Sequence, residues 1–225
     1  TNVDMDIAGN FTTSNAGSVF NTNNKYIKVG GNFTNAAGNS TFTNVIPGGY
    51  LEFNGSVAQN YSPGGILTLE NVMINNSGAG VNLVGFDMLI GPTGSLDLSI
   101  GKIITTPSLE VTVENTDPVF VFNHNALSYV QGNLRRFLSG AAESYDFPVG
   151  HSIKGYQNAN IAFTSNTLIP DLLANFETYP SLPTGPVSND CVGYDYSLSN
   201  VLDNGFWNIN ASLNANSGTY DATLY

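Results

Sequence analysis

A repeat of about 22 residues near the amino terminus limits the possible folds of this chain more than any other feature of its sequence. The tetrapeptide GNFT occurs at 9–12 and again at 31–34. Short alternating segments, each closed by Gly or Asn, follow as far as residue 115. Repeats of this length without helical periodicity are typical of a β-solenoid, in which each coil covers the apolar edge of the next. The sequence therefore predicts an all-β chain with a parallel β-solenoid over residues 1–127.

A β-sandwich with regularly spaced strands is the competing interpretation of this region, because both folds alternate with a period of two residues. In a solenoid, one set of apolar residues points inward. This set comprises Ile7, Phe11, Phe20, Ile27, Val29, Phe33, Phe42, Leu51, Phe53, Leu67, Leu69, Val72, Ile74, Leu83, Leu89, Ile90, Leu96, Leu98 and Ile103. No basic residue lies between Lys28 and Lys102. We therefore expect backbone hydrogen bonds and stacked Asn and Thr side chains, rather than salt bridges, to stabilise the coils.

The sequence changes character near residue 123, which indicates a second unit. Regular repeats stop, prolines gather between 170 and 186, and the aromatic share rises toward the carboxy end. We expect an Ig-like β-sandwich module over residues 128–225. Its last segment, SGTYDATLY, alternates up to the final residue. The module is therefore expected to be incomplete at its carboxy end, and the chain to be a segment of a longer protein.

The only two arginines of the chain lie side by side at positions 135 and 136, in a predicted hairpin. One strand would carry Val130, Leu134 and Leu138 on its inner face, and the turn SGAAES would lead into the second strand. In this register Arg136 points inward, opposite Phe147 of the second strand.

The two arginines would then have different environments. Arg135 would lie at the rim near Asp146, where an exposed ion pair contributes about 0.2–1 kcal/mol. Arg136 would need a carboxylate or several carbonyl groups, because a buried guanidinium without a partner is strongly destabilising. The candidate carboxylates are Glu143, Asp195, Asp203 and Asp221. A structural role is favoured over anion binding, because no other cation converges on the pair.

The same hairpin carries a family resemblance. The run YVQGNLRRF, followed by YDFPVG and later by GFWNINAS and SGTYDATLY, resembles a module of large secreted surface proteins of Bacteroidota that use type IX secretion. The resemblance implies an extracellular, adhesive or filament-forming protein at the cell surface, built from repeated β-modules, and it transfers no catalytic residue. It implies framework roles for Gly132, Arg136, Phe147, Pro148, Val149, Gly150, Trp207, Tyr220 and Asp221. With Asp146 from the hairpin register, these form the set of structural residues.

Charge excludes two classes of partner. Seventeen acidic and six basic residues give a net charge of −11, and such a surface repels nucleic acid and anionic lipid. No run of 18 apolar residues is present, so no helix is expected to insert into a membrane.

Three kinds of site are the alternatives to a purely structural protein. Calcium is the only cofactor with any support, since Asp190 and Asp195 share the loop NDCVGYDY and Asp171 and Asp203 could join them. A carbohydrate-binding module would use exposed tyrosines for stacking, with Tyr194 and Tyr196 as ligand residues and Tyr156 and Tyr179 beside them. A polysaccharide-degrading β-helix would need convergent carboxylates. Those of the predicted solenoid are scattered: Glu52, Glu70, Asp87, Asp97 and Glu110.

The sequence thus predicts a non-catalytic extracellular protein, either an adhesin segment or a filament subunit. A carbohydrate-binding module is the first alternative, and a β-helix polysaccharide-degrading enzyme is the second. The expected partners are other copies or further modules of the same long chain, joined by strand addition, together with surface glycans.

Overall fold

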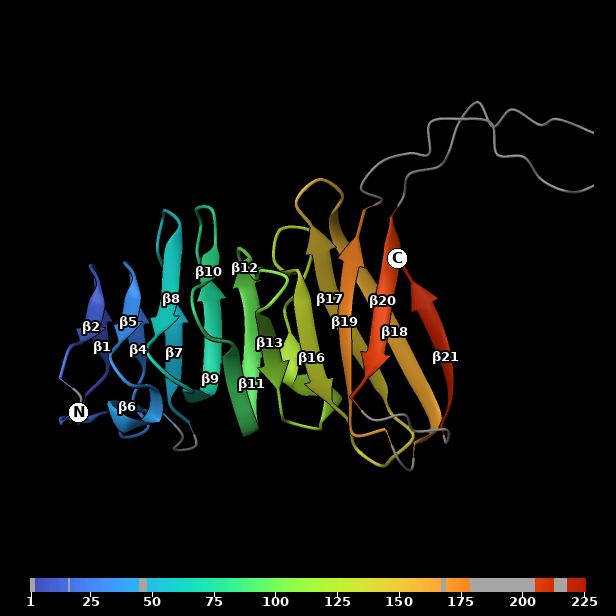
Figure 1. The fold of residues 1–225 in the computed structure, drawn as a ribbon, viewed down its shortest axis with the longest axis horizontal. Coiled ribbons are helices and arrows are strands. Elements are labelled where there is room, and N and C mark those ends of the chain that lie inside the picture. Colours follow the sequence, from blue (N-terminus) through green and yellow to red (C-terminus); the bar gives the residue numbers. More distant parts are fainter. Residues whose placement is uncertain (1–2, 16, 45–47, 167–168, 179–204, 213–217) are drawn as a thin grey trace, which may run out of the picture.

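The computed structural model describes residues 3–15, 17–44, 48–166, 169–178, 205–212 and 218–225. The chain is all-β, and a parallel β-solenoid of about six turns spans residues 5–150. Its coils follow one another along the long axis, from the N-terminal strands at one end to the C-terminal strands at the other (Figure 1). This confirms the solenoid over the competing sandwich for the repeat region.

Two long sheets form the walls of the solenoid, and each coil contributes one strand to each. Sheet A contains, in spatial order, β1 (Met5–Ile7), β4 (Ile27–Val29), β7 (Tyr50–Phe53), β9 (Thr68–Asn75), β11 (Met88–Ile100), β13 (Glu110–Val113), β16 (Asn133–Phe137), β19 (Asp171–Glu177) and β20 (Phe206–Ala211), with β14 (Val121–Phe122) beside β11. Sheet B contains β2 (Phe11–Thr13), β5 (Phe33–Asn35), β8 (Gln59–Pro63), β10 (Val81–Leu83), β12 (Ile103–Ile104), β15 (Val130–Gln131), β17 (Ser144–His151), β18 (Gly155–Asn166) and β21 (Gly218–Leu224). A short third sheet pairs β3 (Phe20–Asn21) with β6 (Phe42–Thr43), and the described residues include the 3₁₀ turns η1 (Gly38–Ser40) and η2 (Pro118–Phe120).

The strand register reproduces the sequence repeat. Phe11 of β2 lies beside Phe33 of β5, and Val81 of β10 lies beside Ile103 of β12, each pair 22 positions apart. Larger coils occur where turns are longer, as between Phe33 and Tyr61. Parallel neighbours therefore carry equivalent residues, which is why the repeat is visible in the sequence.

The core is a continuous apolar column between the two sheets, and it follows the predicted inward set closely. Sixteen of its nineteen residues are buried, and Ile7 and Phe20 pack half-buried against the column. Leu89 is the exception. It is half-exposed, while Met88 and Ile90 on either side are fully buried, because adjacent residues of a strand point to opposite faces. Leu89 and Ile90 could not both face inward.

Stacked aromatic and polar side chains link neighbouring coils. Phe33 stacks between Phe11 and Tyr61, with ring centroids 5.2 and 5.6 Å away. At one corner Asn10 accepts a hydrogen bond from the backbone N–H of Asn32, and the side chain of Asn32 accepts one from the next coil, each at 2.8 Å. Such columns satisfy the backbone groups of the turns, which would otherwise be left unpaired.

The predicted hairpin at the two arginines is wrong. β16 and β17 lie in different sheets, so their apolar faces meet across the core rather than side by side. β17 instead continues sheet B in parallel, with Val149 beside Val130. An inward-facing alternation fits both arrangements, and the sequence of the intervening residues did not distinguish a tight turn from a crossing between sheets.

The sheets change from parallel to antiparallel after β16 and β17. β18 runs back along β17, β19 pairs antiparallel with β16, and β20 and β21 are the outermost strands at this end. Both sheets continue without a break from the solenoid into these strands (Figure 1). No separate Ig-like sandwich is shown among the residues that the structure describes.

Candidate functional site

Arg136 is fully buried, which agrees with its inward position in the alternation. Its guanidinium donates from Nη1 to the carbonyl of Asp146 at 2.8 Å and from Nη2 to the carbonyl of Pro118 at 2.9 Å. The ring of Tyr145 lies 5.2 Å from the guanidinium carbon. Burial lowers the pKa of Arg136 to about 10, so it remains charged at neutral pH. The buried cation is held by carbonyl groups and an aromatic face, not by a paired carboxylate.

The carboxylates proposed for Arg136 lie elsewhere. Glu143 accepts a hydrogen bond from the Tyr145 hydroxyl at 2.8 Å, and Asp221 is exposed on β21. Asp195 and Asp203 lie outside the described residues. Carbonyl groups were the other type of partner expected from the sequence, and the two that accept from Arg136 belong to β17 and η2.

Arg135 forms ion pairs that the sequence did not indicate. Its Nε and Nη2 bind both oxygens of Glu110, at 2.6 and 3.1 Å, and its Nη1 lies 2.6 Å from Asp171. These carboxylates raise the pKa of the guanidinium, the hydrogen bond with Glu110 most of all. The predicted pairing of Arg135 with Asp146 is therefore wrong, because β16 and β17 are not neighbours in one sheet.

Asp146 belongs to a polar cluster on the outer face of sheet B. Its Oδ1 accepts hydrogen bonds from the amides of Asn158 and Asn160, at 3.0 and 2.9 Å, and its Oδ2 lies 3.7 Å from His124 Nε2. The interaction with His124, followed by those with Asn160 and Asn158, holds the pKa of Asp146 well below its usual range. His124 Nδ1 in turn lies 2.9 Å from the hydroxyl of Tyr156. This cluster fastens the loop before β15 to the strands β17 and β18.

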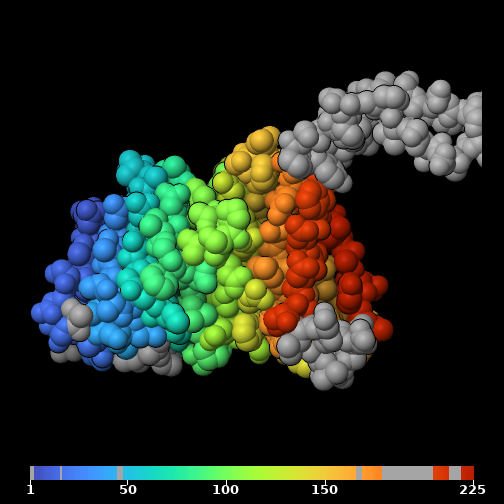
Figure 2. Space-filling model, viewed as in Figure 1, coloured from blue at the N-terminus to red at the C-terminus, as the bar shows by residue number. Residues whose placement is uncertain are grey.

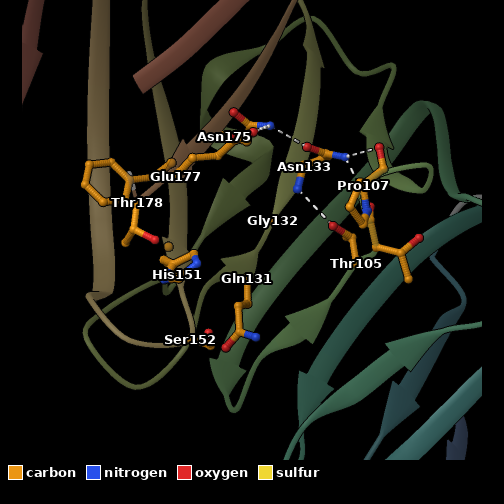
Figure 3. Close-up of a pocket in the computed structure, with 13 residues that line it drawn as sticks. Thr105, Pro107, Gln131, Gly132, Asn133, His151, Ser152, Asn175, Glu177 and Thr178 are labelled. Carbon is orange, nitrogen blue, oxygen red and sulfur yellow. Dashed lines mark hydrogen bonds between the residues drawn. The ribbon is translucent and has the colours of Figure 1, made fainter. Parts of the chain in front are cut away.

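A polar groove lies at the corner where the coils pass from sheet B to sheet A (Figure 3). Its volume is about 530 Å³, and four segments line it: 105–107, 131–133, 150–152 and 175–178. The groove follows from the topology. The chain turns this corner after β12 and after β15, but after β17 it reverses into a hairpin with β18. No further coil therefore covers the corner that follows β15, and this last corner of the solenoid is left open.

Asn133 fixes the floor of the groove. Its side-chain amide donates toward the carbonyls of Thr106, Pro107 and Leu109, at 3.3, 3.4 and 3.0 Å. Its backbone N–H donates to Thr105 Oγ1 at 2.9 Å. The preceding Gly132 has a φ of +123°, and a Cβ there would collide with that same hydroxyl, so this corner requires glycine.

One wall of the groove is positioned by the end of β19. Asn175 donates to Asn133 Oδ1 at 2.8 Å and toward Glu177 Oε1 at 3.4 Å, and the first of these bonds is drawn in Figure 3. The opposite wall carries Gln131 and His151, whose Nδ1 accepts from the backbone of Ile153 at 3.2 Å. The groove thus has a fixed floor and walls that present polar side chains.

The sequence-predicted framework residues lie in three environments. Phe147, Pro148, Val149 and Gly150 are buried in β17. A Cβ on Gly150 would meet the ring of Tyr129 at 2.4 Å, so this position also requires glycine. Trp207 is half-buried and packs edge-on against Phe176 at 5.5 Å. Tyr220 is exposed beside Phe163, at 5.9 Å.

The candidate calcium and stacking residues are only partly within the described chain. Asp190, Asp195, Tyr179, Tyr194 and Tyr196 lie outside the described residues, as does Asp203. Asp171 binds Arg135, and Tyr156 binds His124, so neither stands free. In the part of the chain that the structure describes, no group of three or more His, Cys, Asp or Glu could hold a metal ion.

The solenoid carboxylates are spread over several coils, and only Asp87 and Asp97 share one, that of β11. Each has a hydrogen-bonding partner of its own: Asn75 for Glu52, Thr93 for Glu70, the backbone of Glu110 for Asp87, Ser99 and Asn123 for Asp97, and Arg135 for Glu110. Glu52 also lies 3.7 Å from Lys28. Each of these carboxylates is therefore engaged in a hydrogen bond or an ion pair within the solenoid.

The groove was not found from the sequence. Its residues come from four segments whose proximity depends on where the corner column stops, and nothing in the local patterns indicates that point. The available signal was Gly132 followed by Asn133, which marks a tight corner. These two residues form the floor of an open groove only because they lie at the last corner of the solenoid.

Comparisons with protein-family models, with curated proteins and with solved structures gave no match. No helix in the described ranges is long and apolar enough to cross a membrane.

Proposed function

We propose that this chain is a non-catalytic segment of an extracellular surface protein, either an adhesin segment or a filament subunit. The observation that carries the proposal is the open end of the two-sheet stack at β20 and β21. Supporting features are the extended solenoid, its strongly acidic composition and the stacked polar and aromatic side chains between coils. These interactions depend little on ionic strength, which suits a mechanical role outside the cell.

The open end exposes apolar residues on what should be an inner face. β21 pairs Tyr220 with Phe163 and Leu224 with Ala159, and the β18 partners are buried. Tyr220 and Leu224 point the same way, yet they are 56% and 52% exposed. Figure 2 shows these C-terminal strands, in red, at one end of the molecule.

β20, the outermost strand of sheet A, also carries apolar side chains that are incompletely covered. Trp207 and Ile209 of β20 lie beside Phe176 and Ala174, which are buried, but they are themselves only half-buried. Two neighbouring edge strands with uncovered apolar faces form an acceptor for further β-strands.

We therefore propose that strands of other copies, or of further modules of the same long chain, cover this end. In this proposal the Ig-like module comprises the antiparallel strands from β18 onward, instead of the whole of the predicted range 128–225, and it is closed by such additional strands. The cell-surface location rests on the family resemblance of the sequence.

Sedimentation velocity of the full chain over a range of concentrations tests the proposal. We expect concentration-dependent self-association, which should be abolished by a Tyr220→Lys, Leu224→Lys double variant because charge blocks edge pairing. Electron microscopy of the associated material should show rods joined at their ends. A Val119→Lys, Ile153→Lys double variant is the matched control, since both residues are exposed elsewhere, at 65% and 78%. Equal association of the two double variants would overturn the proposal.

The second candidate function is binding of a surface glycan. The polar groove at the open corner is the observation that favours it.

A further inference from the structure

We infer that the corner groove is a binding site for a neutral, polyhydroxylated saccharide. The inference rests on the proposed adhesive function for its biological meaning, but the binding itself is independent of self-association. A volume of about 530 Å³ falls within the range of roughly 300–1,000 Å³ that small-molecule sites occupy.

The groove presents hydrogen-bonding groups that the protein leaves unused. Among the described residues, the side chains of Gln131, Ser152 and Thr178 make no hydrogen bond, and Glu177 accepts only the long one from Asn175. His151 uses Nδ1 alone, which leaves Nε2 to face a ligand. An amide, two hydroxyls, an imidazole and a carboxylate together offer both donors and acceptors, which suits the hydroxyl groups of a sugar, since each of these can donate and accept.

The charges of the groove exclude acidic sugars. No Lys or Arg lines it, and its fixed charge is the carboxylate of Glu177. The net charge of −11 adds a repulsive field for any anion. Phosphate, sulfate and uronic acid groups are therefore disfavoured, whereas a carboxylate forms strong hydrogen bonds with neutral sugar hydroxyls.

The site is held rigid by the backbone around it. Asn133 is tied to three carbonyls and accepts a hydrogen bond from Asn175, so the floor and the adjoining part of one wall need no reordering on binding. Phe176 lines the groove but is 6% exposed. It provides no stacking platform, so affinity has to come from hydrogen bonds.

The test is saturation-transfer NMR of the full chain with four neutral hexasaccharides, cellohexaose, mannohexaose, laminarihexaose and chitohexaose, and with oligogalacturonate as the acidic counterpart. We expect at least one neutral hexasaccharide to bind and oligogalacturonate not to bind. Glu177→Gln and Gln131→Ala should each weaken binding about tenfold, the effect of one hydrogen bond to a charged or well-placed group.

Matched controls separate the groove from general effects. Glu114→Gln makes the same change of charge at a half-buried site outside the groove, and Gln157→Ala shortens a glutamine on β18. Both should bind like the unmodified chain. Ser152→Ala, at an exposed loop position, provides a further groove variant should either of the first two fail to fold.

Each outcome decides the inference. It is overturned if none of the neutral hexasaccharides binds, if oligogalacturonate binds better, or if the groove variants bind as tightly as the controls. Loss of self-association in the Tyr220→Lys, Leu224→Lys variant would leave sugar binding unchanged, so the failure of one proposal is distinguishable from failure of the other.

Discussion

Replacing Arg136 with Met tests whether carbonyl groups, rather than a carboxylate, hold the buried guanidinium. The substitution removes both the desolvation cost of the buried guanidinium and the hydrogen bonds that it donates. Burial lowers the pKa of Arg136 to about 10, which corresponds to about 3 kcal/mol against the charged form at 1.36 kcal/mol per pKa unit. Against this, the carbonyls of Asp146 and Pro118 lose their donors, at about 1–3 kcal/mol each.

The two contributions largely offset each other. Methionine keeps apolar contact with Tyr145 and is of similar length, so we expect Arg136→Met to lower the free energy of unfolding by about 0–3 kcal/mol. If a carboxylate were the partner, the substitution would strand a buried charge and cost about 3–5 kcal/mol.

Urea unfolding followed by tryptophan fluorescence and circular dichroism measures the difference. Lys102→Met is the control, since this lysine lies half-exposed over the ring of Tyr129 at 4.9 Å, and its loss should cost about 1 kcal/mol or less. A loss well above 3 kcal/mol for Arg136→Met, with the control unchanged, would refute the carbonyl account.

Three further predictions concern the coils and the outer cluster. Phe33→Ala should lower the free energy of unfolding by about 3–5 kcal/mol, because a fully buried ring is removed from the stack; Phe86→Ala, at a 39% exposed position, should cost much less, and similar losses would contradict the stacked core. Asn76→Ala should cost about 2 kcal/mol or more in the same assay, since its buried side chain donates to Val57 and accepts from two backbone N–H groups; an unchanged midpoint would contradict this role. Asp146 has a folded-state pKa below its unfolded value, so its contribution to the free energy of unfolding is present above about pH 4 and is lost as the pH falls. The midpoint of thermal unfolding between about pH 2 and 6 should therefore depend less on pH in Asp146→Asn than in the unmodified chain. Equal slopes for the two proteins would exclude this contribution.

The sequence predicts the solenoid because its register is nearly local. A residue and its neighbour in the next coil are about one repeat apart in the sequence. Phe11 and Phe33, which occupy equivalent positions of the repeat, are therefore register partners in the fold. Strand alternation then assigns most of the core, and it failed at Leu89 only where two adjacent apolar residues competed for one face.

The arrangement around the arginines could not be predicted in the same way. Strands β16 and β17 face each other across the core, whereas a hairpin would place them side by side, and both satisfy the same alternation. Arg135 binds Glu110 of β13, in the preceding coil, and Asp171 of β19, which runs antiparallel to β16. The open corner groove likewise depends on where the coils stop, which is a property of the whole topology.

The central claim is that residues one repeat apart lie side by side in parallel strands. Thr12 and Thr34 are exposed register partners in β2 and β5, so their Cα atoms should be separated by one strand spacing of about 4.8 Å, within reach of a disulfide. In a chain with the native cysteine replaced, Cys191→Ser, the pair Thr12→Cys, Thr34→Cys should cross-link quantitatively within the monomer under mild oxidation. Thr12→Cys, Ser62→Cys spans two strand spacings, roughly 9.6 Å, and should not. Cross-linking of the second pair, or its absence in the first, would contradict the solenoid.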